Sequence, residues 1–449
     1  MPIERSGPLT WSQRDWIFGL PPSRASSFED NFSRQIAIAP MPFPAVRAAV
    51  RDVLLRHENL RSRARPRRPD EPQDVDPVDE RLDEVVTPVP IETAAETART
   101  AERICFDIER EWPIRIFAAG DERGVSRLIV AVDHWAVDGW AIRVLSDDLA
   151  SATAARAAGE AWRDPAPVEQ PIDVARWERS PVGSEHLQRC LGYWREHYER
   201  LRRELEGFRP VLPGAGPDAA AGPQFHGRRL RSRRLRAAAP VAAAALRVPA
   251  AALYLAAFAA AIGAAEASTG LGLLTLSANR GSPAALRSIR NAVLPAPVFL
   301  PGLAGRPFPE VLQASRRELA QGHRSANVEP MATRRLAREI LGDLAVTGVT
   351  DAKFNYLTHA GLGLRAGDTA DDPGPGGPAD GTVEAFPARA QGPIYMLVVF
   401  EDVATVDLTL RWRCDTGWQH AAEPMLRHIE DLVLYAADPG RTTPVYGRT

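Results

Sequence analysis

Residues 128–140 read Leu-Ile-Val-Ala-Val-Asp-His-Trp-Ala-Val-Asp-Gly-Trp, and no other stretch of the chain is as informative. The apolar run before Asp133 predicts a buried β-strand over residues 127–133, and the Asp-Gly pair that follows His134 predicts the start of a helix over 140–155. A turn of this kind can expose the imidazole of His134 in a cleft while the carboxylate of Asp138 fixes the local backbone. A buried histidine satisfied by hydrogen bonds is the alternative, and so short a motif does not by itself decide between this role and an active-site role for His134.

Other short sequence motifs lie on both sides of this stretch, in a fixed order along the chain. They are Pro8-Leu9-Thr10-Trp11-Ser12-Gln13, Arg56-His57-Glu58-Asn59-Leu60-Arg61, Phe106-Asp107-Ile108 with Pro113-Ile114-Arg115, Trp177, Tyr193-Trp194, Ala278-Asn279-Arg280 and Phe354-Asn355-Tyr356. Together with the stretch around His134, this ordered set resembles the condensation domains of nonribosomal peptide synthetases, whose signature is His-His-x-x-x-Asp-Gly. The resemblance extends over nearly the whole chain. Asp133 stands where that family has its first histidine, and His134 stands where it has the second.

Composition agrees with a large globular enzyme. The 449 residues suffice for two domains, and 45% hydrophobic with 25% charged residues is ordinary for such proteins. The formal net charge of −2 gives no electrostatic case for nucleic acid or for an anionic membrane. Three widely spaced cysteines without a metal-ligand pattern, and an N-terminus without a signal-peptide pattern, favour a reducing, cytoplasmic compartment. The apolar residues 250–265 fall short of the ~20 residues that a membrane span needs and predict a buried core helix.

Patterning along the chain predicts a mixed α/β protein with two lobes. Helices are predicted over 44–56, 94–106, 140–155, 185–205, 250–265 and 423–436, and strands over 127–133, 272–277, 395–400 and 405–412. Residues 64–90 are predicted to form an exposed or irregular segment, and residues 228–236 a strand with a solvated face. Loops are predicted over 207–224 and 366–382.

A linker over residues 164–170 places the domain boundary. The predicted domains are 1–170, which carries His134, and 171–449. The resemblance implies that each lobe is of the chloramphenicol-acetyltransferase type, that the two form a V-shaped pseudo-dimer within a monomer, and that the active site lies at their junction. A channel there would admit one phosphopantetheine arm of a carrier protein from each end.

The resemblance also implies the chemistry, which is attack of an amine or an alcohol on an acyl thioester. His134 then lies beside the reacting atoms, either as general base or as the group that orients the nucleophile. Asp138 is implied to form an ion pair with Arg280 that fixes the position of the loop carrying His134. The backbone N–H of Gly139 could face a developing oxyanion. Asn355 could donate its amide toward the substrate, or could stabilise a turn.

This chain departs from the family at three places near the expected site. Asp133 would favour the protonated form of a nearby imidazole, but neighbouring side chains of a regular strand point to opposite faces, so Asp133 could instead meet an arginine behind the site. Ala141 stands where the family often has serine, and Arg290-Asn291-Ala292-Val293 replaces the family's Gly-Phe-x-Asn-Thr word. The last two departures indicate either a different handling of the substrate or a loss of activity.

Three hypotheses follow. The first is a free-standing condensation enzyme of natural-product biosynthesis that joins a carrier-bound acyl or aminoacyl thioester to an amine, because neither an adenylation domain nor a carrier attachment site is found in the sequence. The second is an acyltransferase of the same superfamily that makes an ester or accepts a small nucleophile. The third is a non-catalytic module that docks carrier proteins. The sequence predicts no metal site and no cofactor bound by the chain itself, with substrates held on phosphopantetheine arms.

Overall fold

The computed structural model describes residues 3–19, 31–66, 68, 70–101, 103–163, 166–205, 225–266, 270–342, 352–362, 380–389, 395–414, 418–438, 440 and 444. The chain forms two compact α/β units, which confirms the predicted fold class and the two lobes. The first unit comprises Met1–His186, Ala278–Val293 and Ala360–Asp368, and the second comprises Leu187–Ser277, Leu294–His359 and Thr369–Thr449. The division thus lies after residue 186 rather than after residue 170, and two later segments belong to the first unit.

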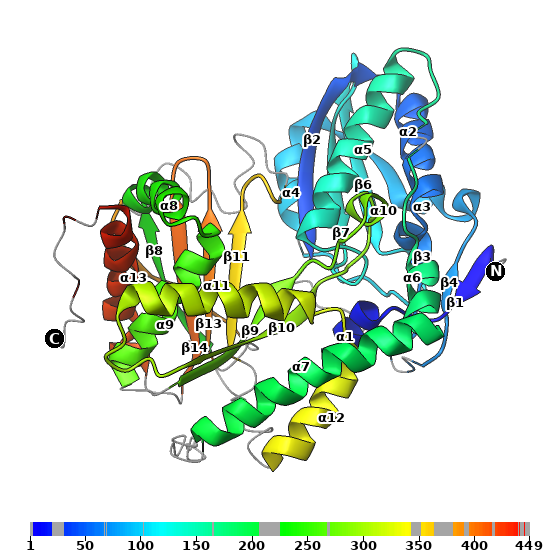
Figure 1. Cartoon of the computed structure of the whole chain (residues 1–449). Helices are drawn as coiled ribbons and strands as arrows, with labels where there is room; N and C mark the ends of the chain where they lie inside the picture. Colours follow the sequence, from blue (N-terminus) through cyan, green and yellow to red (C-terminus); the bar gives the residue numbers. More distant parts are fainter. Residues whose placement is uncertain are drawn as a thin grey trace. The chain divides into compact units, whose positions relative to one another are not determined.

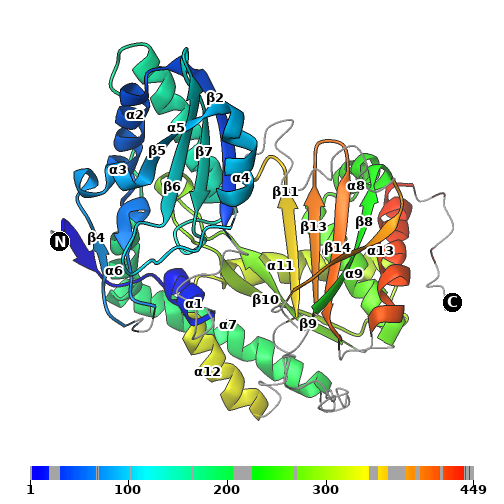
Figure 2. The ribbon, with the colours of Figure 1, turned by 180° about the vertical axis from the view of Figure 1, so that it is seen from behind.

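A four-stranded sheet forms the core of the first unit (Figures 1 and 2). Its strands, in spatial order, are β2 (Phe32–Met41), β7 (Gly124–Val132), β6 (Ile114–Asp121) and β5 (Val86–Pro90). The first three are antiparallel, whereas β5 pairs with β6 in parallel. The main helices of the unit are α2 (Phe43–Arg56), α4 (Ala94–Ala101) and α5 (Gly139–Ala157). Every residue from Leu128 to Val132 is buried, so β7 reads as a continuous apolar run rather than an alternating one.

Smaller elements complete the first unit. They are the sheet β1 (Arg5–Gly7), β4 (Gln73–Val75) and β3 (Ser62–Arg63), the helices α1 (Trp11–Gly19), α3 (Leu82–Val85), α6 (Pro171–Glu178) and α10 (Pro283–Leu286), and the 3-10 helices η2 (Glu58–Arg61), η3 (Val78–Glu80) and η4 (Ile91–Thr93). The prediction of an exposed or irregular excursion over 64–90 was wrong for much of its length. Asp76 in this stretch is fully buried, because its carboxylate accepts hydrogen bonds from Arg63 and from the indole N–H of Trp112.

The second unit is built on a seven-stranded sheet. In spatial order the strands are β10 (Leu294–Pro301), β9 (Gly270–Ser277), β11 (Lys353–Thr358), β13 (Tyr395–Glu401), β14 (Val406–Arg413), β8 (Phe225–Ser232) and β12 (Val383–Arg389). The helices are α7 (Pro181–Leu205), which begins in the first unit, α8 (Arg233–Leu246), α9 (Ala250–Glu266), α11 (Phe308–Arg324), α12 (Pro330–Leu341) and α13 (Ala422–Ala437), with the 3-10 helix η8 (Trp418–His420). Strands β13 and β14 form the predicted antiparallel pair.

Helix α9 is the predicted core helix, and its residues from Ala252 to Ala259 are buried. The predicted strand over 228–236 ends early, because Ser232 caps α8 by accepting the N–H of Leu235. The loop predicted over 207–224, and residues 366–379 of the loop predicted over 366–382, lie outside the described residues. No single described helix is long and apolar enough to cross a membrane, and α8 and α9 pass that test only as a pair bent by 102°.

Candidate active site

The loop 133–138 joins the buried end of β7 to the start of α5. Strand β7 ends at Val132, so the expectation that Asp133 continues a regular strand was wrong. The Asp133 Oδ1 atom accepts the backbone N–H of Trp135 at 2.7 Å, and its backbone carbonyl accepts that of Ala136 at 3.0 Å. Asp133 and Trp135 are both buried. The carboxylate in place of the family's first histidine therefore closes the turn that presents His134.

The imidazole of His134 lies between two aromatic side chains of the first unit. Trp16 of α1 stacks on it with ring centroids 4.4 Å apart, and Phe32 at the start of β2 meets it edge-on at 5.0 Å. His134 itself is only partly buried, unlike the residues on either side of it. The two aromatic contacts restrict rotation of the ring while leaving part of it accessible.

Asp138 anchors the far end of the loop. Its Oδ1 atom accepts the N–H of Ala141 at 2.8 Å and so caps α5. Arg280 donates to both carboxylate oxygens, at 2.8 and 2.9 Å, and both side chains are almost fully buried. Oδ2 also accepts the N–H of Ala292 at 2.9 Å. The ion pair that the resemblance implies between Asp138 and Arg280 is thus present, and it binds the segment 278–293 to the loop.

Gly139 begins α5, directly after this anchor. A Cβ atom built on it would lie 2.4 Å from Leu362 Cδ2, so the glycine permits Leu362 to approach the helix start. Its suggested part in binding an oxyanion stays a prediction. Asn355 lies on β11 in the second unit, next to the buried Phe354, and its suggested contact with substrate likewise stays a prediction.

The structure adds a set of buried amides and hydroxyls to which no role was assigned from sequence. Gln13 donates to Asn59 Oδ1 at 3.1 Å, and Asn59 donates to the carbonyl of Ala136 in the loop at 2.5 Å. Ser12 donates to the carbonyl of Asn291 at 2.6 Å, and Asn291 donates to the carbonyl of His134 at 3.0 Å. Two of the motifs quoted above thus supply the residues that hold loop 133–138 in place: Ser12 and Gln13 from the first motif, and Asn59 from the second. In the sequence, these contacts were indicated only by the position of the two motifs in the ordered set.

Buried charges lie beside this network. Burial raises the pKa of Glu178 to about 8, although the N–H of Trp11, which Glu178 accepts at 2.9 Å, and the nearby Arg290 act in the opposite direction. Burial, and then the charge of Arg280, lowers the pKa of Arg290, whose guanidinium lies 3.2 Å from Glu169. These groups connect the end of α6 and the start of α1 with the segment that carries Asn291.

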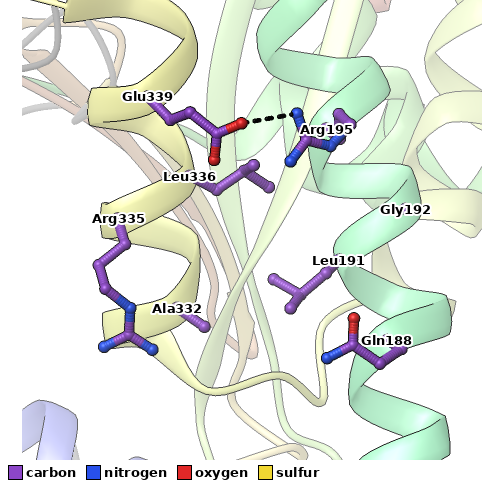
Figure 3. Close-up of a pocket in the computed structure, with 8 residues that line it drawn as sticks. All are labelled: Gln188, Leu191, Gly192, Arg195, Ala332, Arg335, Leu336 and Glu339. Atoms are coloured by element: carbon purple, nitrogen blue, oxygen red, sulfur yellow. Dashed lines mark hydrogen bonds and ion pairs between the residues drawn. The ribbon is translucent and has the colours of Figure 1, made fainter.

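A separate groove of about 380 Å³ lies in the second unit, between α7 and α12 (Figure 3). It is lined by Gln188, Leu191, Gly192, Arg195, Ala332, Arg335, Leu336 and Glu339. Arg195 and Glu339 form an ion pair of 3.0 Å across it. None of the residues predicted for the active site lines this groove, and we assign it no part in the chemistry.

Comparison with known proteins supports the resemblance drawn from sequence. No family model matches the chain. A segment of 210 residues is 35% identical to a probable non-canonical nonribosomal peptide synthetase, CymA, of Salinispora arenicola, and one of 195 residues is 33% identical to an isonitrile lipopeptide synthase of Mycobacterium tuberculosis. These matches cover 44% and 39% of this chain but only 3% and 8% of the two relatives.

Solved structures share the fold over nearly the whole chain. The X-domain from teicoplanin biosynthesis matches 100% of this chain and 99% of its own length, with a TM-score of 0.69 and 22% identity. A structure that describes condensation domain-mediated chain release from the enacyloxin polyketide synthase matches 99% of this chain and 86% of its own length, with a TM-score of 0.70 and 18% identity. The first condensation domain of the calcium-dependent antibiotic synthetase matches 98% of both chains, with a TM-score of 0.67 and 15% identity. The chain therefore has the fold of condensation domains.

Proposed function

We propose that this protein is a condensation enzyme that joins an acyl or aminoacyl thioester, held on a carrier protein, to an amine and forms an amide. The observation that carries the proposal is the arrangement at loop 133–138, where His134 is partly exposed and braced by Trp16 and Phe32 while Asp138 and Arg280 anchor the loop. The identity to two peptide-forming synthetases over about 200 residues supports the same chemistry.

The proposed reaction needs a group that can exchange or share a proton next to the thioester carbon. Imidazole is suited to this near neutral pH. His134 meets the geometric requirement, because the loop and the two aromatic rings fix its position without burying it fully. The acyl groups would arrive on the phosphopantetheine arms of carrier proteins in the cytoplasm, and the chain itself would bind no further cofactor and act as a monomer.

Intact-protein mass spectrometry of acyl-loaded carrier proteins tests the proposal. The loaded carriers are incubated with candidate amines, or with a second aminoacyl-loaded carrier, and with wild type, His134→Ala or His186→Ala. His186 is the matched control, because it lies in the same unit and its ring contacts Trp177 of α6. We expect a condensed product mass with wild type and His186→Ala, and a rate lower by roughly 10²–10⁴-fold in a folded His134→Ala. An equal rate in all three proteins would contradict the assignment of His134.

A non-catalytic docking role is the second candidate. It is favoured by the loss of the family's first histidine at Asp133 and by the likeness in fold to the teicoplanin X-domain, which has been solved in complex with OxyB. Under this role no donor and acceptor pair gives a product, while carrier proteins bind equally to wild type and to His134→Ala. An ester product with an alcohol acceptor, in place of an amide, would instead identify the acyltransferase alternative.

A further inference from the structure

The orientation of the Asn291 amide follows from its neighbours in the first unit. The N–H of Val293 donates to Asn291 Oδ1 at 3.2 Å, which turns the Nδ2 group toward His134. Nδ2 lies 3.0 Å from the His134 carbonyl oxygen and 3.4 Å from the ring nitrogen Nδ1. Asn291 is only 4% exposed, and its own carbonyl is held by Ser12. The amide is therefore fixed on both sides.

This contact determines which ring nitrogen of His134 carries the proton. An amide nitrogen has two hydrogens to donate and cannot accept, so Nδ1 must be the acceptor. A neutral imidazole has a single N–H, which then lies on Nε2. The other tautomer would point an Nδ1–H at the hydrogens of the Asn291 amide. Within the described residues no hydrogen bond reaches Nε2, so its N–H is available to a ligand.

We propose that Asn291 is a positioning residue that holds His134 in the Nε2–H tautomer, so that His134 donates a hydrogen bond to the substrate instead of removing its proton. The recipient of that bond, the thioester carbonyl oxygen, rests on the proposed function, whereas the tautomer does not. Donation to an oxygen that gains negative charge lowers the barrier to addition, because the bond strengthens as the charge develops.

The reaction balances without a basic histidine. The amine nitrogen forms a bond to the thioester carbon, and the carbonyl electron pair moves to the oxygen that accepts the Nε2–H bond. The carbonyl then re-forms, the carbon–sulfur bond breaks, and the thiolate takes the proton that the nitrogen loses. His134 keeps its own proton throughout. An amine attacks without prior deprotonation far more readily than an alcohol, so this tautomer favours the amide product over the ester.

Nitrogen-15 NMR of histidine-labelled protein measures the tautomer directly. The His134 signals are those that disappear in His134→Ala, and their couplings to the ring protons distinguish Nδ1 from Nε2. At a pH where the ring is neutral, we expect an acceptor-type shift for Nδ1 and an N–H-type shift for Nε2. The reverse pattern in wild type overturns the proposal, whatever the activity of the protein.

An isosteric variant tests the part played by Asn291. In Asn291→Asp one oxygen can still accept from Val293, while the other accepts from Nδ1, so the proton should move to Nδ1 and amide formation should fall by on the order of 10²-fold. Asn279→Asp is the matched control, because Asn279 lies in the same segment and donates to the Ala292 carbonyl. It should leave the His134 shifts unchanged. An unchanged tautomer in Asn291→Asp would overturn the proposal, whereas the expected tautomer in a wild type without turnover would contradict only the proposed function.

Discussion

At the residue scale, each carboxylate oxygen of Asp138 accepts two hydrogen bonds. The partners are Ala141 and Arg280 at Oδ1, and Arg280 and Ala292 at Oδ2. Arg280 also donates to three backbone carbonyls of the segment that follows it. Because both charged groups are buried, neither can exchange its partner for water. The pair therefore secures the geometry around His134 more than it takes part in the reaction itself.

Replacement of Asp138 by alanine should damage folding as well as catalysis. Removal of one partner leaves Arg280 buried without its counterion, and we expect a loss of ~3–5 kcal/mol in the free energy of unfolding. Asp147→Ala is the control, because Asp147 lies on the same helix, is 60% exposed and faces Arg143 at 3.7 Å. It should change stability by about 0–1 kcal/mol. Urea unfolding measures both, and similar losses in the two variants would refute the structural role of Asp138.

At the element scale, the junction of α6 and α7 depends on close backbone packing. A Cβ atom on Gly183, in the first turn of α7, would lie 2.1 Å from the carbonyl oxygen of Trp177 and 2.8 Å from that of Glu178. Backbone atoms cannot rotate away as the end of a side chain can. Glycine at this position therefore allows the long helix to start immediately after α6.

Two glycine substitutions on α7 should have opposite effects. Gly183→Ala forces the two helices apart and should cost ~1–3 kcal/mol. Gly192→Ala lies farther along the same helix, has open space around its Cβ and should gain up to about 1 kcal/mol from helix propensity. Chemical denaturation of the two variants checks this difference. A stabilised Gly183→Ala would show that the α6–α7 junction relaxes at little cost.

At the scale of the whole molecule, Glu178 should make stability depend on pH. Its folded pKa of about 8 lies above the ordinary value of 4.5, so between these values the folded protein holds a proton that the unfolded chain has lost. The contribution of this group to the free energy of unfolding therefore falls as pH rises through that window, by at most about 1.4 kcal/mol per pH unit.

Glu178→Gln should remove this dependence. The variant should gain stability relative to wild type as the pH rises from about 5 to about 8, because glutamine cannot ionise in the buried site. Glu185→Gln provides the control, since Glu185 is exposed at the start of α7. Thermal unfolding across this range gives the comparison. Parallel pH profiles for wild type and Glu178→Gln would mean that Glu178 stays ionised when folded.

Local patterning was sufficient to predict the elements that bring His134 into place. The apolar run of β7, the helix start at Asp138 and the buried helix α9 each follow from neighbours in the chain, because unbroken apolar runs and a capping residue are visible locally. The ordered set of motifs also predicted the fold and the ion pair between Asp138 and Arg280. The prediction that the strand continues through Asp133 was wrong. The Asp133 carboxylate accepts a hydrogen bond from the backbone N–H of Trp135, and the chain turns there.

The amino-acid sequence by itself determined the α/β class, the two lobes and the candidate histidine, because these depend on local patterns of apolar residues and on short contiguous motifs. Only the tertiary structure decided which side chains orient that histidine. Asn291 meets His134 across 157 residues of chain, and Ser12 meets Asn291 across 279. Contacts over such separations depend on how sheets and loops pack, and no local pattern encodes them. The burial of Glu178, and hence its raised pKa, has the same origin.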